Sequence, residues 1–162
     1  MVLIDVPPER YPECLEVLRL GFGSVTADYG ITAQNTPHNP AFWSPADLEA
    51  VVARPAELYA VADPDVLGCA FVLASRSRPG TWELRHLAVL PSARHRGLGE
   101  TLVVEGVSRA RAAGATVLRI GIVGENVRLG DWYRRLGFET VSAGVRHPGL
   151  PFSVEHLELS LG

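Results

Sequence analysis

The fold is decided by residues 83–100, which read ELRHLAVLPSARHRGLGE. The apolar run up to Leu90 is typical of a central β-strand, and Pro91 ends it. From Gly99 to Ala113, small and apolar residues recur at three- and four-residue steps, the period of one buried helix face. The stretch therefore predicts a strand, a tight loop and a helix that begins at the loop.

The loop between this strand and this helix has the chemistry of an anion site. The first N–H groups of a helix have no intrahelical partner, and the positive end of the helix dipole points towards the loop. Gly97 and Gly99 let a phosphate approach the backbone, while Arg94 and Arg96 supply positive charge. A dinucleotide fingerprint would need glycine where Leu102 stands, and a phosphate loop ending in Gly-Lys is excluded because the chain has no lysine.

The remaining elements follow one another without repeats or linkers. Further strands are predicted at residues 2–5, 57–62, 66–75, 116–123, 138–145 and 152–161, and further helices between 8 and 20, from a Ser44 cap to about 53, and at 126–136. Residues 24–42 read as a long loop with one irregular turn. Loops of this length in a small domain are usually functional or mobile.

Length and composition predict one globular domain, residues 1–162. The chain is 47% hydrophobic and 20% charged, enough for a sizeable core. It has neither a twenty-residue apolar run nor a basic leader, so we expect a cytoplasmic protein that does not enter a membrane. Cys14 and Cys69 stand alone, which favours buried free thiols and predicts neither a disulfide framework nor a metal site.

Charge is distributed unevenly. Residues 1–80 hold five arginines and ten acidic residues, whereas residues 81–162 hold ten arginines and eight acidic residues. A positive second half suits a polyanionic cofactor, although ordinary solvated charge would give the same pattern. An acidic protein without a basic stripe argues against nucleic acid as a partner.

The motifs of the second half resemble those of the Gcn5-related N-acetyltransferase (GNAT) superfamily. They are a strand closed by proline, the Arg-x-x-Gly-x-Gly loop, a helix, a second strand, Asn126, and DWYRRLGF at 131–138. The first half agrees in its order of elements. The resemblance implies an α/β (α+β) fold: a single GNAT-like domain with a mixed, mostly antiparallel seven-stranded sheet and helices on both faces. Its fourth and fifth strands would splay apart to admit the pantetheine arm of acetyl-CoA.

The resemblance also implies which residues hold acetyl-CoA. The loop residues Arg94, His95, Arg96, Gly97, Leu98, Gly99 and Glu100 would bind the pyrophosphate through backbone N–H groups. The strand backbone at Leu87, Ala88 and Val89 would pair with the pantetheine and bind the acetyl carbonyl, and Asn126 would contact the pantetheine or adjoining backbone. The alternative for the loop is a surface turn that merely starts a helix.

Two residues match the family's catalytic positions. Glu83 precedes Arg94 by eleven residues, the offset of a catalytic glutamate, and would take the amine's proton directly or through water. Tyr133 follows Asn126 by seven residues, and its hydroxyl would donate to the cofactor sulfur. The structural alternatives are a strand-edge glutamate paired with Arg85 or another arginine, and a tyrosine that only packs beside Trp132 and Phe138.

Three histidines rank below Glu83 as bases. His86 is expected on the opposite face of the strand from Glu83, because side chains alternate along a strand. His38 and His156 are reserves, because a lone histidine is more often structural than catalytic.

The predicted function is transfer of an acetyl group from acetyl-CoA to a primary amine of a small molecule, by direct attack in a ternary complex. The resemblance places the acceptor groove at Tyr29, His38, Trp43 and residues 146–152. A protein or peptide N-acetyltransferase and a non-catalytic acyl-CoA sensor are the alternatives. The acceptor's identity and the length of the acyl group stay open, and a homodimer is the base-rate expectation.

Overall fold

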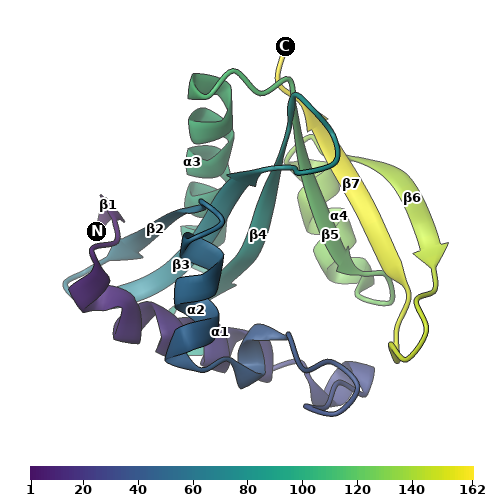
Figure 1. Cartoon of the computed structure of the whole chain (residues 1–162), viewed down its shortest axis with the longest axis horizontal. Helices are drawn as coiled ribbons and strands as arrows, with labels where there is room; N and C mark the ends of the chain where they lie inside the picture. Colours follow the sequence, from purple (N-terminus) through teal and green to yellow (C-terminus); the bar gives the residue numbers. More distant parts are fainter.

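Alternating apolar segments form one twisted sheet at the centre of the molecule, and the computed structural model describes all residues 1–162. Its strands are β1 (Val2–Asp5), β2 (Glu57–Ala62), β3 (Val66–Ala74), β4 (Thr81–Val89), β5 (Val117–Val123), β6 (Glu139–Val145) and β7 (Val154–Ser160). They lie in the order β1-β2-β3-β4-β5-β7-β6 (Figure 1). Only β4 and β5 are parallel; the other neighbours are antiparallel. The mixed, mostly antiparallel seven-stranded sheet is confirmed.

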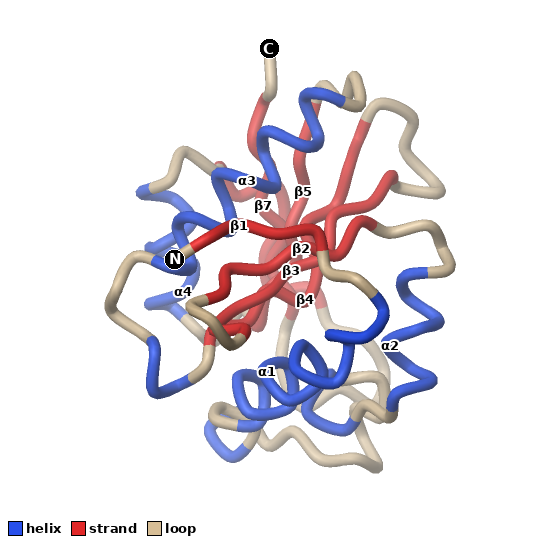
Figure 2. Tube along the Cα trace, turned by 90° about the vertical axis from the view of Figure 1, so that its left-hand side faces the viewer, coloured by secondary structure: helices blue, strands red, loops and turns tan.

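Helices cover both faces of this sheet, as predicted (Figure 2). On one face, α1 (Tyr11–Gly23) and α2 (Pro45–Val52) enclose a core with Trp43 and Phe71. On the other, α3 (Leu98–Ala112) and α4 (Val127–Arg135) enclose a core with Leu118 and Phe138. None of these helices has the length and apolar character needed to cross a membrane.

Local signals place several element ends where the sequence predicts them. Ser44 caps α2: its Oγ accepts from the Asp47 N–H, and the Asp47 carboxylate accepts from the Ser44 N–H. Cys14 and Cys69 are buried free thiols, as expected. The long loop differs in detail, because it contains two 3₁₀ turns, Ala27–Tyr29 and Pro40–Phe42, instead of one.

The sheet divides where β4 and β5 separate. These strands pair at only three positions, and the last joins Glu83 to Arg119. Beyond that position β4 stays paired with β3, and β5 stays paired with β7. The edge of β4 that faces β5 therefore has no strand partner after Glu83, and Figure 1 shows the two strands diverging from there. The predicted splay is present.

A bulge interrupts β4 inside this divided region. The register with β3 runs from Ala88 opposite Cys69 to Arg85 opposite Phe71, so β4 carries an extra residue. His86 has φ +55°, an unusual value for a residue other than glycine. The ring of His86 packs edge-on against Phe71, with centroids 5.8 Å apart, and thus lies on the α1 face. Leu84 belongs to the opposite core.

Close packing of α3 on the sheet depends on Gly106. A Cβ at this position would lie 2.6 Å from the Tyr59 hydroxyl and 3.1 Å from a Leu84 methyl. We predict that Gly106→Ala lowers the free energy of unfolding by about 1–3 kcal/mol, although alanine favours helices. Thermal and urea unfolding would measure the change. Gly23→Ala is the control, because a Cβ there meets nothing within 4 Å; equal stability of the two variants would contradict the packing argument.

Candidate active site

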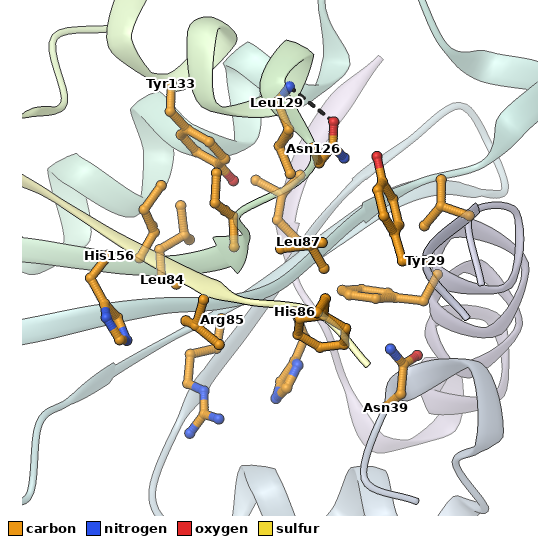
Figure 3. Close-up of a pocket in the computed structure, with 18 of the residues that line it drawn as sticks. Tyr29, Asn39, Leu84, Arg85, His86, Leu87, Asn126, Leu129, Tyr133 and His156 are labelled. Carbon is orange, nitrogen blue, oxygen red and sulfur yellow. Dashed lines mark hydrogen bonds between the residues drawn. The ribbon is translucent and has the colours of Figure 1, made fainter. Parts of the chain in front are cut away.

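A cleft of about 490 Å³ opens where β4 and β5 separate. One wall is β4 from Glu83 to Leu87, and the other is β5 from Arg119 to Val123. On one face of the sheet, α4 closes the cleft. On the opposite face, the α1–α2 connection and β7 line it (Figure 3). The cleft therefore joins the two faces of the sheet.

The predicted phosphate loop presents a row of free hydrogen-bond donors. No hydrogen bond within the protein engages the six backbone N–H groups from His95 to Glu100. His95 (φ +62°) and Gly97 (φ +78°) both adopt the left-handed conformation. Left-handed residues in a turn orient successive N–H groups into a concave anion site, and here the turn lies at the N-terminus of a 15-residue helix.

The two arginines of the loop differ in their surroundings. The Arg94 guanidinium donates to the Ser24 hydroxyl at 2.9 Å and to the Gly21 carbonyl at 3.2 Å, so it ties the loop to the end of α1. Arg96 is exposed and forms no contact of this kind. The structure thus leaves Arg96 as the unengaged positive charge of the loop.

Gly97 offers a direct test of the loop. A Cβ there would meet nothing within 4 Å, but the left-handed backbone disfavours it by about 1–2 kcal/mol. Gly114, past the end of α3, has φ +85° and equally open surroundings. We predict that alanine lowers the melting temperature by a few degrees at either position, and that only Gly97→Ala weakens acetyl-CoA binding. Calorimetry of both variants measures this, and equal acetyl-CoA affinities would remove Gly97 from the phosphate site.

Asn126 fixes the start of α4 at the cleft. Its Oδ1 accepts from the Leu129 N–H at 3.2 Å, which caps the helix, and its side chain lines the cleft. Glu125 accepts from the Ser153 N–H and hydroxyl, at 2.9 and 2.6 Å, and so holds β7 beside this turn. The cap and this clamp position α4 over the gap between the strands.

Tyr133 lies on the α4 side of the cleft with its hydroxyl directed into it (Figure 3). Its ring is 6% exposed and packs edge-on against Trp132 and Phe138, at centroid distances of 4.8 and 5.5 Å. The Tyr133 hydroxyl forms no hydrogen bond within the protein. Because every fully buried side-chain polar atom has a partner, this hydroxyl is not fully buried, and it borders the cleft. Burial raises the pKa of Tyr133, which keeps the phenol protonated.

Trp132 connects the loop to the cleft. It lines the cleft beside Tyr133, and a Cβ added to Gly99 would lie 3.3 Å from its ring. Gly99 therefore lets α3 pack closely against α4, and this contact places the free N–H groups of the loop beside the cleft.

Glu83 lines the cleft without forming a hydrogen bond or ion pair, so the predicted alternative of a pair with Arg85 is absent from the structure. Its neighbour Arg119 instead binds Glu158 at 3.0 Å, and Glu158 also binds Arg78. Burial opposes ionisation of Glu158, but the hydrogen bonds from the two arginines outweigh it and lower its pKa. Glu158 thus binds Arg119, the residue paired with Glu83 across the two strands, and the Glu83 carboxylate keeps no partner.

His86 is on the same face as Glu83, and the expectation of opposite faces was wrong. The extra residue of the bulge puts Arg85 and His86 on one side of β4, whereas a regular strand would alternate them. The His86 ring packs against Trp43 at 4.7 Å. Burial, together with the charges of Arg85 and Arg54, lowers the pKa of His86 to about 3, so the ring is neutral at physiological pH.

His156 faces the cleft from β7. Its Nδ1 lies 3.1 Å from the Ser142 hydroxyl, and burial and the charge of Arg119 lower its pKa. It sits on the same side of the sheet as Arg85 and His86 (Figure 3). His156 is therefore a neutral imidazole on the same side of the sheet as Glu83, and these are the two properties that a second candidate base requires.

The residues predicted to form the acceptor groove do not all line the cleft. Tyr29 and Phe152 line it. Trp43 does not: it is 4% exposed, belongs to the α1-side core, and its indole N–H donates to the His38 carbonyl at 2.9 Å. His38 does not line the cleft either. An aromatic residue in an irregular loop carries no periodicity that would separate core from surface.

Sequence analysis also missed several residues of the cleft. Arg85, Asn39 and the apolar residues Phe22, Val25 and Ile31 line it. Arg85 was predictable, because it lies two residues after Glu83 and shares its face of β4. The others come from the long loop and the end of α1, where only the folded contacts bring them to the cleft.

The sequence profile described as the acetyltransferase (GNAT) family matches residues 28–138. The chain belongs to this family. The match includes β4, the loop before α3, β5 and α4, whereas the end of α1 and β7, which also line the cleft, lie outside it.

Individual relatives agree with the GNAT assignment. A Bacillus subtilis (strain 168) protein, the uncharacterized N-acetyltransferase YvbK, is 30% identical over 82 residues, which are 51% of this chain and 52% of that protein. The chain thus aligns with about half the length of this curated relative. The ribosomal-protein-alanine N-acetyltransferase of Brucella melitensis has the same fold, with a TM-score of 0.76, 19% identity and 99% of each chain covered. So does the Salmonella typhimurium protein yncA, solved with its cofactor acetyl-CoA, with a TM-score of 0.72, 20% identity, and coverage of 100% of this chain and 94% of that chain.

Proposed function

We propose that the protein is an acetyl-CoA-dependent N-acetyltransferase that acts on a primary amine of a small molecule. The observation that carries the proposal is the cleft between β4 and β5, in which the free Tyr133 hydroxyl and the unpaired edge of β4 lie beside a loop with six free N–H groups. Nothing in the protein satisfies these donors, and together they match what a pyrophosphate, a pantetheine amide and a thioester require.

The residues present fit acetyl-CoA. The concave N–H array from His95 to Glu100, with Arg96 beside it, would hold the pyrophosphate. The open edge of β4 around Leu87, Ala88 and Val89 would pair with the pantetheine as an added strand would, with Asn126 opposite. Acetyl-CoA supplies the activated acyl group. That yncA was solved with acetyl-CoA supports the same use of this fold.

The proposed reaction is direct attack in a ternary complex. Glu83, on the α1 face of the sheet, takes a proton from the acceptor ammonium directly or through water, and the neutral amine attacks the acetyl carbonyl. The C–N bond would form and the C–S bond would break, and the sulfur would leave with a proton donated by Tyr133 on the α4 face. The second proton that the nitrogen loses on becoming an amide would restore the Tyr133 hydroxyl through water. The divided sheet allows the two groups to act from opposite faces.

The test is acetyl-CoA-dependent release of thiol across polyamines, amino acids, aminoglycosides and short peptides, with a control lacking acceptor. We expect release above the control with a small amine and an acetylated product by mass spectrometry. Release with peptides alone would favour a protein acetyltransferase. Acetyl-CoA binding without release for any acceptor would point to a sensor and overturn the proposed activity.

A further inference from the structure

Arg85 is the one positively charged side chain of the cleft without a partner. The cleft holds two arginines, and the other, Arg119, is bound to Glu158 at 3.0 Å. Arg85 is partly buried and makes no hydrogen bond or ion pair. A guanidinium carries five donors in a planar fork and cannot lose its charge in a protein. Because the guanidinium N–H groups of Arg85 have no partner in the protein, they can bind a planar anion in the cleft.

Regular alternation along β4 places Arg85 on the face of Glu83, which is the acceptor side. Figure 3 shows Arg85, His86 and His156 extending from the sheet on the side opposite Tyr133 and Asn126. Arg54, at the end of α2, is near enough for its charge to lower the pKa of His86 together with that of Arg85. Arg85 and Arg54 thus both contribute positive charge near His86, and of these two only Arg85 lines the cleft.

Glu83 and Arg85 are spaced so that a single ligand could contact both side chains. They lie two residues apart on the same face of β4, a separation of about 6.6 Å along a strand. They do not bind each other in the structure. A ligand that bears an ammonium and a carboxylate on one carbon atom would satisfy both: the ammonium next to the base, and the carboxylate on the guanidinium fork.

The walls beside Arg85 are apolar. Phe22, Val25, Tyr29, Ile31 and Phe152 line the acceptor side of the cleft, and only Asn39 adds an amide. A buried wall of this kind favours an aliphatic or aromatic side chain over a charged one.

We propose that the acceptor is an α-amino acid with an apolar side chain, whose carboxylate is bound by Arg85. The inference rests on the proposed acetyltransferase function and narrows its substrate class. Arg85 binds and orients, whereas Glu83 and Tyr133 carry the proton transfers. A polyamine or an aminoglycoside places no anion on Arg85 and adds positive charge beside it, so it is disfavoured.

The experiment uses matched acceptors and matched variants of the full chain. Phenylalanine, phenylalaninamide and phenethylamine share a side chain, and only the first carries the carboxylate; leucine and its amide form a second set. Rates are compared per concentration of free-base amine, since the three amines differ in basicity. Arg85→Gln removes the fork, Arg85→Lys keeps a point charge, and Arg76→Gln is the control because Arg76 is exposed in the β3–β4 turn.

We expect kcat/KM for phenylalanine to exceed that for its amide by about tenfold to a hundredfold, the range for a charge-assisted hydrogen bond. Arg85→Gln should reduce this ratio to near one, chiefly through the KM of the amino acid, with an unchanged KM for acetyl-CoA. Arg85→Lys should keep part of the preference, and Arg76→Gln all of it.

Each other result overturns the inference in a distinguishable way. Equal use of acid, amide and amine by the unaltered protein would leave the acetyltransferase function standing and remove the carboxylate site. A preference that survives in Arg85→Gln would place the carboxylate on another group. If acetyl-CoA binds but none of the acceptors is acetylated, both the proposed function and this inference are overturned.

Discussion

Tyr133→Phe is expected to lower kcat by about a hundredfold or more while the affinity for acetyl-CoA changes less than about twofold. The hydroxyl has no partner in the protein and borders the cleft. Its loss removes a donor to the leaving sulfur and leaves no buried group unsatisfied. The ring keeps its packing against Trp132 and Phe138, so the cleft keeps its shape.

Steady-state kinetics with both substrates, together with calorimetry of acetyl-CoA binding, would measure this separation. Tyr59→Phe is the matched control. The Tyr59 hydroxyl is buried and donates to the Leu102 carbonyl at 2.7 Å, away from the cleft. Its loss should cost about 1–3 kcal/mol of stability and leave kcat unchanged. Equal losses of kcat and acetyl-CoA affinity in Tyr133→Phe would contradict the assignment of Tyr133 as the acid.

The parts of the fold predicted from the sequence are those that local rules determine. The helix after RHRGLG, the Ser44 cap and the β2–β3 hairpin each depend on residues within one turn or one strand pair. The order of strands and helices, read with the family resemblance, then specifies the sheet. Because the candidate site is built on these elements, Glu83 and Tyr133 line one cleft, and the loop contacts the cleft residue Trp132 through Gly99.

What the sequence did not predict depends on distant contacts. The bulge at His86 is visible only in the pairing of β4 with β3, where the register shifts between Cys69 and Phe71, and no pattern within β4 reveals the extra residue. Arg94 reaches Gly21, 73 residues earlier, so its role as a tie to α1 is invisible locally. Trp43 becomes core because Phe71 and α1 cover it. Each error concerns the α1 face, where the chain is least regular.

The bulge has a chemical consequence that regular alternation would not allow. It adds the His86 ring to the face that Glu83 and Arg85 already share through regular alternation, and burial keeps the imidazole neutral. The acceptor side thus gains a fixed positive charge from Arg85 without a second one from His86. The base and the anion-binding group can therefore face the same ligand.

Glu83→Gln is expected to lower kcat by about a hundredfold near neutral pH and to change the shape of the pH–rate profile. Glutamine has the size of glutamate but cannot accept a proton. Without a carboxylate at this position, no side chain of β4 can take the proton from the bound ammonium. The rate of the variant should therefore rise with pH only as the acceptor amine loses its own proton in solution.

The control for this prediction is Glu139→Gln, which removes one carboxylate from an exposed position on β6 that forms no ion pair. Both variants change the net charge equally, so a difference between their profiles reports the position of Glu83. The melting temperature of Glu83→Gln should be unchanged, because no partner depends on this carboxylate: Glu158 already binds Arg119. A profile identical to that of the unaltered protein would remove Glu83 from the mechanism and leave His156, an imidazole on the same face that also lines the cleft, as the base to test next.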